Sequence, residues 1–367
     1  MLVLLPCGLP RYCYWRSRSR CRRCRSNNLT LIAPAGSFET RPYSLNDLGY
    51  LAGVTFQGAT SQGFTWINGQ FTLLPNYPGS VNGEVRGINN AGDAAGWGIL
   101  PNGDVHPYIY TFAGTLTDVS AAIAPYAITL GMNANDIVIG TGYQPGNPDS
   151  AWIYDAKTGQ TTWIPNMGGD FGWPNSINAS GAIVGYQRTS NGPTALFAAF
   201  LYNGGVLTSL GGFGGSSYGS QINNAGGIAG FSQTSPGGPR NAFYRAPGST
   251  TLVNLHPASG WPETLATDST ADGRVISGIG YRDDGHKRAV AWFDGVFVDL
   301  NTLLPPGSDL EFRSAGFIND LGQIAGYAAR NSDGLILTVL LTPAPEPATL
   351  ILCAPLLVYL AYRRKNR

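Results

Sequence analysis

One sequence pattern recurs seven times along the chain, and it constrains the fold more than any other feature. It consists of an apolar residue, Asn, two variable residues, Gly, one variable residue, two apolar or small residues and a closing Gly, as in INASGAIVG over residues 177–185. The copies, including a degenerate one at 270–278, lie 43 to 48 residues apart when measured between their closing glycines. Regular spacing of this kind is the signature of a repeat architecture. The closing glycines are Gly53, Gly96, Gly140, Gly185, Gly230, Gly278 and Gly326.

Most repeats contain two further apolar runs. An aromatic run such as AFLY (199–202) comes first, and a second run such as VLTSL (206–210) follows a Gly-containing turn. Short runs of branched and aromatic residues bounded by Gly, Asn and Pro predict β-strands. The Asn-x-x-Gly of the pattern predicts a tight hairpin between two more strands, because the Asn side chain can bond the backbone two residues on and Gly adopts the left-handed conformation. Each repeat therefore predicts four strands.

A four-stranded unit on its own would expose both faces, so neighbouring units must stack to bury them. Repeats of 40–50 residues with four strands each describe the blades of a β-propeller. The sequence therefore predicts an all-β fold, a seven-bladed β-propeller of four-stranded blades with repeats of about 45 residues. The last repeat lacks its fourth strand, and we expect LTLI (29–32) to supply it by pairing with residues 336–341.

Charge is distributed unevenly along the chain. Residues 26–343 carry 12 of the 23 basic residues and 21 of the 22 acidic ones, so the body of the chain is acidic although the net charge is +1. An acidic body lacks the electrostatic footprint that binds phosphate backbones. We therefore expect no nucleic-acid partner.

The two ends differ in composition from the repeats. Residues 1–28 are rich in Arg and Cys, and their Cys21-x-x-Cys24 lacks the second ligand pair that a zinc site needs. We interpret this segment as disordered or as a misassigned start. The predicted domains are then 1–28, a repeat domain over 29–343, and a C-terminal segment over 344–367.

The C-terminal segment has three parts in a fixed order. Pro345-Glu346-Pro347 precedes an apolar run over 348–362, and the chain ends in RRKNR. The run is shorter than the roughly 20 residues of a relaxed spanning helix, and the cations behind it favour the cytoplasmic side. This order resembles the PEP-CTERM sorting signal. The resemblance implies a short transmembrane sorting helix in the inner membrane of a Gram-negative bacterium that makes exopolysaccharide, with processing by an exosortase near Pro345, Glu346 and Pro347.

The repeats themselves also resemble a known family. The Asn-x-x-Gly pattern, the AFLY-type strand and the LGG turn at 210–212 are similar to the HAF repeat of extracellular bacterial proteins, and the resemblance covers nearly all of 44–341. The aromatic strands lack the His that names the family, and the sixth copy matches poorly. The resemblance implies an extracellular setting and no particular activity.

A search for catalytic and metal-binding patterns gives little. Residues 215–219 fit GxSxG, but a hydrolase needs that Ser on a strand-to-helix turn, and no helix pattern follows. The three histidines show no metal-pair spacing, and no DxDxDG-like calcium loop is present. We expect no catalytic residue, no metal site and no cofactor, and hence not an enzyme.

The connections between strands offer candidate binding residues. Tyr77, Trp173, Tyr218 and Trp261, with Phe171 and Phe213 beside them, are expected on the face where the blades are joined, among many Asn, Ser and Gly residues. Exposed aromatic rings with amide and hydroxyl neighbours suit stacking on sugar rings. The alternative is that these rings pack the seams between blades.

Together these features predict a secreted, cell-surface or exopolysaccharide-matrix-associated protein with a structural, adhesive or glycan-binding role. Its partners would be an exosortase, the inner membrane through 348–362, and exopolysaccharide or other surface glycans. An alternative is a propeller-fold carbohydrate-active enzyme, a polysaccharide lyase or hydrolase. A protein–protein scaffold fits the sequence equally well.

Overall fold

The computed structural model describes residues 28–123, 126–144 and 147–343, and one compact unit spans Leu29–Leu341. Within these residues the regular secondary structure is almost entirely β-strand, and turns and loops connect the strands. The described helical segments are a single helical turn, α1 (Ser120–Ile123), and a 3-10 turn, η1 (Leu300–Leu303). The predicted all-β class is confirmed.

Five of the sheets consist of four consecutive antiparallel strands each. This is the outcome expected from repeats that each contain four short runs separated by Gly, Asn and Pro. The strands are β6 (Asn82–Ile88), β7 (Ala94–Ile99), β8 (Val105–Tyr110) and β9 (Leu116–Asp118); β10 (Ala127–Met132), β11 (Ile137–Gln144), β12 (Asn147–Asp155) and β13 (Gln160–Trp163); β14 (Gly172–Ile177), β15 (Ile183–Arg188), β16 (Phe197–Asn203) and β17 (Val206–Gly211); β18 (Ser217–Ile222), β19 (Ile228–Gln233), β20 (Arg240–Arg245) and β21 (Val253–Asn254); and β22 (Glu263–Ser269), β23 (Val275–Tyr281), β24 (Lys287–Phe293) and β25 (Val296–Asp299).

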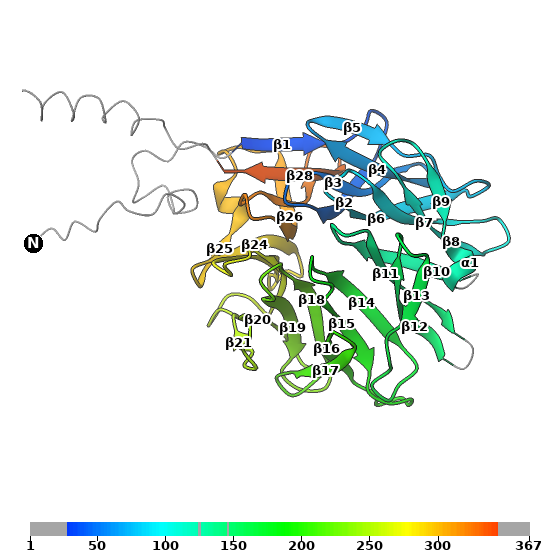
Figure 1. Cartoon of the computed structure of the whole chain (residues 1–367). Coiled ribbons are helices and arrows are strands. Elements are labelled where there is room, and N and C mark those ends of the chain that lie inside the picture. The colour runs from blue at the N-terminus through cyan, green and yellow to red at the C-terminus, as the bar shows by residue number, and fades with distance from the viewer. Residues whose placement is uncertain (1–27, 124–125, 145–146, 344–367) are drawn as a thin grey trace, which may run out of the picture. The chain divides into compact units, whose positions relative to one another are not determined.

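The sixth sheet has eight strands and contains both ends of the compact unit. One half is β2 (Glu39–Leu45), β3 (Leu51–Gln57), β4 (Thr60–Ile67) and β5 (Gln70–Leu73), and the other is β26 (Leu310–Ile318), β27 (Ile324–Arg330), β28 (Ile336–Thr342) and β1 (Asn28–Ile32). A single parallel bridge, Glu39 to Ile336, joins the halves. Figure 1 shows β1, in blue, beside β28, in orange-red, and the predicted pairing of 29–32 with 336–341 is confirmed.

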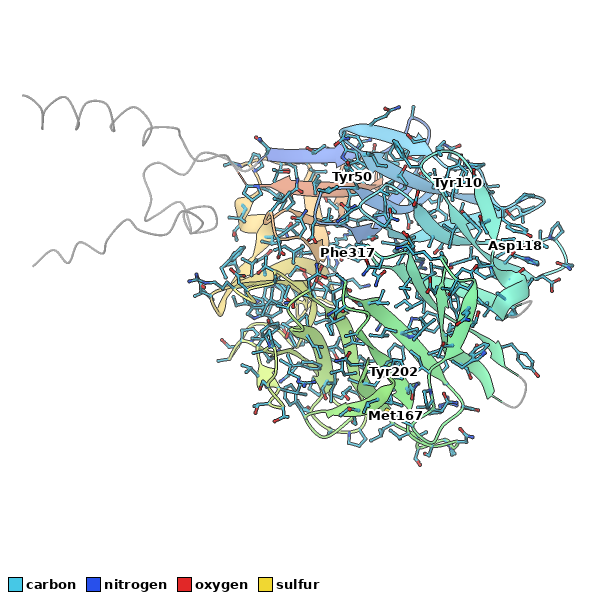
Figure 2. All side chains as sticks on the ribbon, in the orientation of Figure 1. Tyr50, Tyr110, Asp118, Met167, Tyr202 and Phe317 are labelled. Carbon is cyan, nitrogen blue, oxygen red and sulfur yellow. The ribbon has the colours of Figure 1, made fainter. Side chains whose placement is uncertain are left out.

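The hydrophobic core is divided among the seams between consecutive sheets. Most clusters of buried side chains take members from two neighbouring sheets, as when Ile139 and Ala151 pack with Ile183 and Phe200. One cluster joins the two halves of the eight-stranded sheet. Partly buried side chains labelled in Figure 2 flank these clusters: Tyr50 and Tyr110 belong to one seam, Met167 and Tyr202 to another, and Phe317 to a third. Burial therefore requires stacking of the repeats, as expected.

The repeated Asn closes the hairpin between the first two strands of each group. In the fourth repeat, Asn178 Oδ1 accepts hydrogen bonds from the N–H groups of Ser180 (3.1 Å) and Ala182 (3.0 Å). Gly181 follows with a φ of +85°, a conformation that L side chains resist. In the third repeat Asp136 takes the Gly position at a φ of +66°, which Asp tolerates better than most residues.

The amide nitrogen of the same Asn bonds the next repeat. Its Nδ2 donates to the main-chain carbonyl of the equivalent residue one repeat further on, and the last repeat bonds the first. The pairs are Asn46 to Asn89 (2.8 Å), Asn133 to Asn178 (3.0 Å), Asn178 to Asn223 (3.1 Å), Asn223 to Thr270 (2.8 Å) and Asn319 to Asn46 (3.0 Å).

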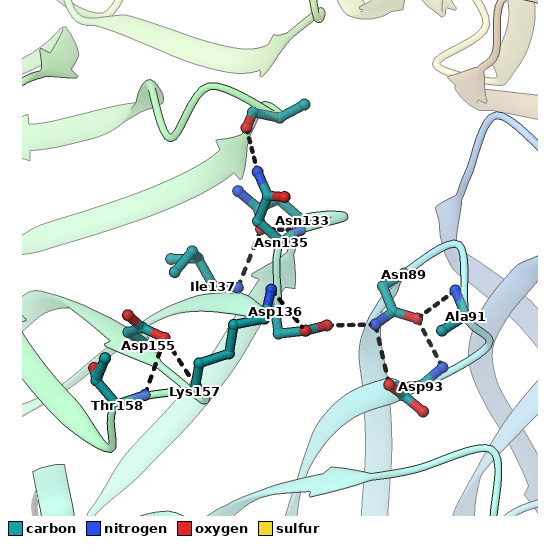
Figure 3. Close-up of polar contacts among 11 residues, drawn as sticks. Asn89, Ala91, Asp93, Asn133, Asn135, Asp136, Ile137, Asp155, Lys157 and Thr158 are labelled. Carbon is teal, nitrogen blue, oxygen red and sulfur yellow. Dashed lines mark hydrogen bonds and ion pairs between the residues drawn. The ribbon is translucent and has the colours of Figure 1, made fainter.

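Two seams depart from this arrangement. Asn89 Nδ2 donates instead to the carboxylate of Asp136 (2.7 Å), as Figure 3 shows. In the degenerate sixth repeat Thr270 replaces Asn, and Asp268 Oδ2 accepts from the N–H of Ile318 (2.9 Å) in the next repeat. All the seams between consecutive hairpins are therefore crossed by a side-chain hydrogen bond.

The closing Gly is required by crowding from two sides. The first strand of each group has a register shift, such as that between Pro174 and Ser176, which brings a carbonyl oxygen against the second strand. A Cβ on Gly185 would collide with the carbonyl of Trp173 and with the ring of Phe200 on the third strand. The other six closing glycines face an equivalent carbonyl, so no side chain fits at any of them.

The hairpin bonds give a stability prediction. Asn178→Ala removes the acceptor for two N–H groups and the donor to Asn223, all in a buried position, so we expect a loss of about 2–4 kcal/mol in the free energy of unfolding. Urea denaturation would measure it, with Asn191→Ala, at an exposed loop position, as the control. Equal midpoints for the two variants would contradict this role for the hairpin Asn.

Candidate functional site

Two recesses are candidates for a site. The first lies where the repeated hairpins meet and has a volume of about 140 Å³. Its lining combines hairpin asparagines with three carboxyl groups, Asp47, Asp268 and Asp320, and contains no Lys or Arg. Among the described residues no group of His, Cys, Asp or Glu is arranged to hold a metal ion.

Asp268 is the most perturbed acid in this recess. It is fully enclosed, and its oxygens accept hydrogen bonds from the N–H groups of Ser269 (2.7 Å) and Ile318 (2.9 Å). Burial raises its pKa to about 8, and the nearby carboxylates of Asp47 and Asp320 add to the rise. The hydrogen bonds place Asp268 in the seam between repeats, where it replaces the missing Asn contact.

The second recess is formed by three consecutive sheets, and we call it the aromatic hollow. It is lined by the rings of Tyr186, Tyr218 and Phe231 and by polar groups around them. Tyr218 lies against both neighbours, with ring centroids 4.8 Å from Phe231 and 4.9 Å from Tyr186. The remaining lining residues are Asn175, Gln233, Gly237, Gly238, Arg240 and Glu263.

Arg240 and Glu263 form the charged pair of the hollow. The guanidinium of Arg240 donates to Glu263 Oε2 through Nε (3.0 Å) and Nη2 (2.5 Å), and its main-chain N–H donates to Oε1 (3.3 Å). The guanidinium also lies over the rings of Tyr281, at 5.2 Å, and Phe231, at 6.0 Å. These contacts fix its plane.

The phenol group of Tyr186 is neutral at physiological pH. Burial raises the pKa of Tyr186 to about 12, and the neighbouring Tyr218 adds to the rise. A neutral phenol can donate a hydrogen bond as well as accept one. The hollow therefore presents apolar ring faces bordered by amide, phenol, guanidinium and carboxylate groups.

The four aromatic residues that the sequence suggested for glycan binding do not lie together in one site. Tyr218 lines the hollow, and Trp173 lies on the same strand as the lining residue Asn175, two residues away. The Trp173 ring stacks on Phe171, with centroids 5.9 Å apart. Whether either residue binds a glycan stays a prediction.

The other two aromatic residues pack elsewhere. The hydroxyl of Tyr77 donates to Asp118 (2.7 Å, Figure 2 labels Asp118), and its ring stacks on His106 at 4.9 Å. Trp261 packs edge-on against Phe297 at 5.1 Å, beneath the guanidinium of Arg282. Both fit the alternative in which loop aromatics pack the seams.

The expectation that Trp173 and Tyr218 lie in connections was wrong, because they lie in strands β14 and β18. The first strand of each group begins well before the repeated hairpin. Its side chains alternate between buried and partly exposed, and Trp173 and Tyr218 are on the partly exposed side. Gly-rich segments before each strand concealed this alternation.

Several lining residues were missed from the sequence. Tyr186 and Phe231 each directly follow a closing Gly, and the same position holds Trp97 and Tyr327 in other repeats. That recurrence is a signal that could have identified them. Arg240 and Glu263 occupy positions outside the repeated pattern, so no spacing pointed to them.

The GxSxG segment is structural. Ser216 Oγ accepts from the N–H of Phe197 (3.1 Å) and Ser217 Oγ from that of Ala199 (2.9 Å), and Ser217 is the first residue of strand β18. The sorting motif Pro345, Glu346 and Pro347 and the run 348–362 lie outside the described residues. Within the described part of the chain no helix is long and apolar enough to cross a membrane.

Neither a protein-family model nor a curated protein matches the sequence. Solved structures do match the fold. The β-propeller domain of the Trilobed protease from Pyrococcus furiosus, described as having an open velcro topology, aligns with a TM-score of 0.56 at 10% identity over 83% of this chain and 95% of that domain. An oligogalacturonate lyase in complex with manganese aligns with a TM-score of 0.53 at 13% identity, over 88% of this chain and 97% of that one.

A structure from a study of two prolyl endopeptidases also aligns, with a TM-score of 0.53 at 13% identity over 84% of this chain and 51% of that one. At such identities the likeness is one of fold alone. The chain therefore has a β-propeller fold, and these proteins' activities do not transfer to it.

Asp268 gives a prediction on pH. Its folded pKa is raised, so the folded state binds a proton that the unfolded state releases, and stability falls as the pH rises from about 4 to about 8. We expect a lower free energy of unfolding at about pH 8.5 than at about pH 7, and a smaller difference in Asp268→Asn. Asp283→Asn, at an exposed position, is the control.

Urea denaturation at both pH values measures these differences. The comparison stays above the range where His256 titrates, because burial lowers the pKa of that imidazole. A pH dependence that persists unchanged in Asp268→Asn would show that another group is responsible.

Proposed function

We propose that the chain is a seven-bladed propeller, exported and displayed at the surface of a Gram-negative cell, that binds glycans through the aromatic hollow. The observation that carries the proposal is the hollow itself, in which partly exposed ring faces are bordered by fixed hydrogen-bonding groups. Its role would be adhesive or structural within an exopolysaccharide matrix.

The count of seven blades rests on the repeated hairpin. Each copy connects the first two strands of a four-stranded group, and the eight-stranded sheet holds two such groups, β2–β5 and β26–β28 with β1. Only the single bridge from Glu39 to Ile336 merges them. We therefore interpret that sheet as two blades.

The chemistry of the hollow suits sugar binding. The C–H face of a pyranose is apolar and packs on aromatic rings, whereas its hydroxyl edge needs donors and acceptors. Tyr218 and Phe231 supply rings, and Asn175 and Gln233 supply amides. Pockets with a few placed polar groups on an apolar lining are the usual form of small-ligand sites.

Binding fits the hollow better than glycoside hydrolysis. Hydrolysis generally uses two carboxyl groups that flank the scissile bond. Among the described residues that line the hollow, Glu263 is the sole carboxyl group, and it is bonded to Arg240. We therefore propose a binding protein and not an enzyme.

The surface location is supported by the sequence alone. The order of Pro345-Glu346-Pro347, an apolar run and a basic end supports export followed by exosortase processing. The run over 348–362 would anchor the chain in the inner membrane until it is processed.

Binding can be tested with the full-length chain and the host's own extracellular polysaccharide. Tyr218→Ala should weaken retention in affinity electrophoresis by about tenfold, which corresponds to about 1.4 kcal/mol, because it removes the central ring of the hollow. Tyr126→Ala, which removes an exposed ring outside the hollow, should bind normally. Reducing-end assays on the same mixtures should show no cleavage, and sustained cleavage would favour the enzyme alternative.

Sorting can be tested separately in the host. Glu346→Ala should leave membrane insertion intact and block maturation, because recognition needs the motif and insertion needs only apolar area. Replacing Leu356 and Leu357 with Asp should abolish insertion, since each charge costs about 2.5–3.5 kcal/mol at a helix centre. Immunoblots of membrane and culture medium give the readout, and release of the Glu346→Ala protein at the parent's processed size would refute the sorting motif.

A further inference from the structure

We propose that the aromatic hollow selects uncharged sugar residues, and that the Arg240–Glu263 pair forms hydrogen bonds with their hydroxyl groups. This inference rests on the glycan-binding function proposed above. It concerns which class of glycan the hollow accepts, and it depends on how charge is arranged around the rings.

The hollow is electrically balanced. Arg240 is the one cation and Glu263 the one anion among the described lining residues, and their side chains lie 2.5 to 3.0 Å apart. A carboxylate-bearing sugar at the guanidinium would lie beside the carboxylate of Glu263, which already neutralises Arg240, and the two like charges would repel each other. A neutral sugar meets no such repulsion.

The pair keeps hydrogen-bonding capacity for a ligand. A guanidinium has five N–H groups, and Glu263 accepts two of them from the Arg240 side chain. Both Arg240 side-chain bonds reach Glu263 Oε2, so Oε1 is held only by the longer main-chain contact. A sugar hydroxyl group can accept a hydrogen bond from the guanidinium of Arg240 and donate one to Glu263 Oε1. Both members of the pair can therefore bind the hydroxyl edge of a neutral sugar.

Other lining groups support the same class of ligand. Asn175 Nδ2 donates to the carbonyl of Gly219 (2.7 Å), which fixes the orientation of this lining amide. Gly237 and Gly238 add no side chains to the wall, so backbone groups border the space there. These groups supply hydrogen bonds without net charge.

The first strands of three other four-stranded groups also pair an Arg with a Glu. Glu84 and Arg86 on β6 are 2.6 Å apart, and Glu311 and Arg313 on β26 are 2.8 Å apart. On β2, Glu39 and Arg41 are likewise paired. Each of these three arginines is thus ion-paired with a Glu two residues before it, and Glu311 also pairs with Arg288 of β24.

One cation near the hollow would favour acidic sugars instead of uncharged ones. Lys287 Nζ lies 5.9 Å from the ring of Tyr281, the same ring that supports Arg240, although Lys287 is not part of the lining. If the hollow bound acidic sugars, Lys287 would be the group to attract them. The experiment therefore includes a variant at this position.

The test is isothermal titration of the full-length chain with uncharged and acidic hexasaccharides at low and high salt. We expect cellohexaose, xylohexaose or mannohexaose to bind with an affinity that salt hardly changes, and hexagalacturonate to bind at least tenfold more weakly. Glu263→Gln should weaken the uncharged ligand about tenfold and improve hexagalacturonate, because Arg240 then lacks its counter-charge. Glu84→Gln breaks a matched pair outside the hollow and should change neither affinity.

Arg240→Lys provides a second variant that keeps the charge but loses the planar fork, and it should also weaken the uncharged ligand. Thermal melts confirm that each variant is folded. Preference for hexagalacturonate, or loss of binding in Lys287→Met with no effect of Glu263→Gln, would overturn this inference while leaving glycan binding intact. Failure of the parent protein to bind either class or the host polysaccharide would overturn both proposals.

Discussion

The fold depends on the side chain of the repeated Asn, which forms hydrogen bonds both within its own hairpin and to the neighbouring repeat. The carboxamide oxygen of the repeated Asn accepts hydrogen bonds within its own hairpin, and the nitrogen of the same group donates to the next repeat. Asp could do only the first and Lys only the second, because a carboxylate has no donor and an ammonium no acceptor. The requirement for both functions in one buried position explains why Asn recurs where turns elsewhere in the chain tolerate several residues.

Much of the fold could be predicted because its determinants are periodic. The closing glycines fixed the repeat length, the aromatic runs identified the third strands, and the unpaired run 29–32 identified the closing strand. The role of the closing Gly could not be inferred, since it depends on a carbonyl pushed forward by a register shift in the neighbouring strand. A shift of that kind leaves no mark in the sequence.

The candidate site was predicted only in part, for a related reason. Tyr218 stood out as an aromatic residue near a connection, but the hollow also takes residues from the preceding and following sheets. Arg240 and Glu263 are 23 residues apart and lie at positions that the pattern leaves variable. The repeated positions thus hold the ring together, and the variable ones supply its surface chemistry, so a search for repeats finds the first group and misses the second.

The pairing of β1 with β28 has a consequence for how the chain reaches this structure. These strands come from opposite ends of the compact unit, so the contact that completes the last sheet joins residues roughly 300 positions apart. The entropy of closing so long a loop grows only logarithmically with length and costs little equilibrium stability. Its effect falls on the folding rate, because contacts between distant residues form slowly. Until synthesis reaches β28, the N-terminal strand has no partner, and the ring closes only after the whole domain has been made.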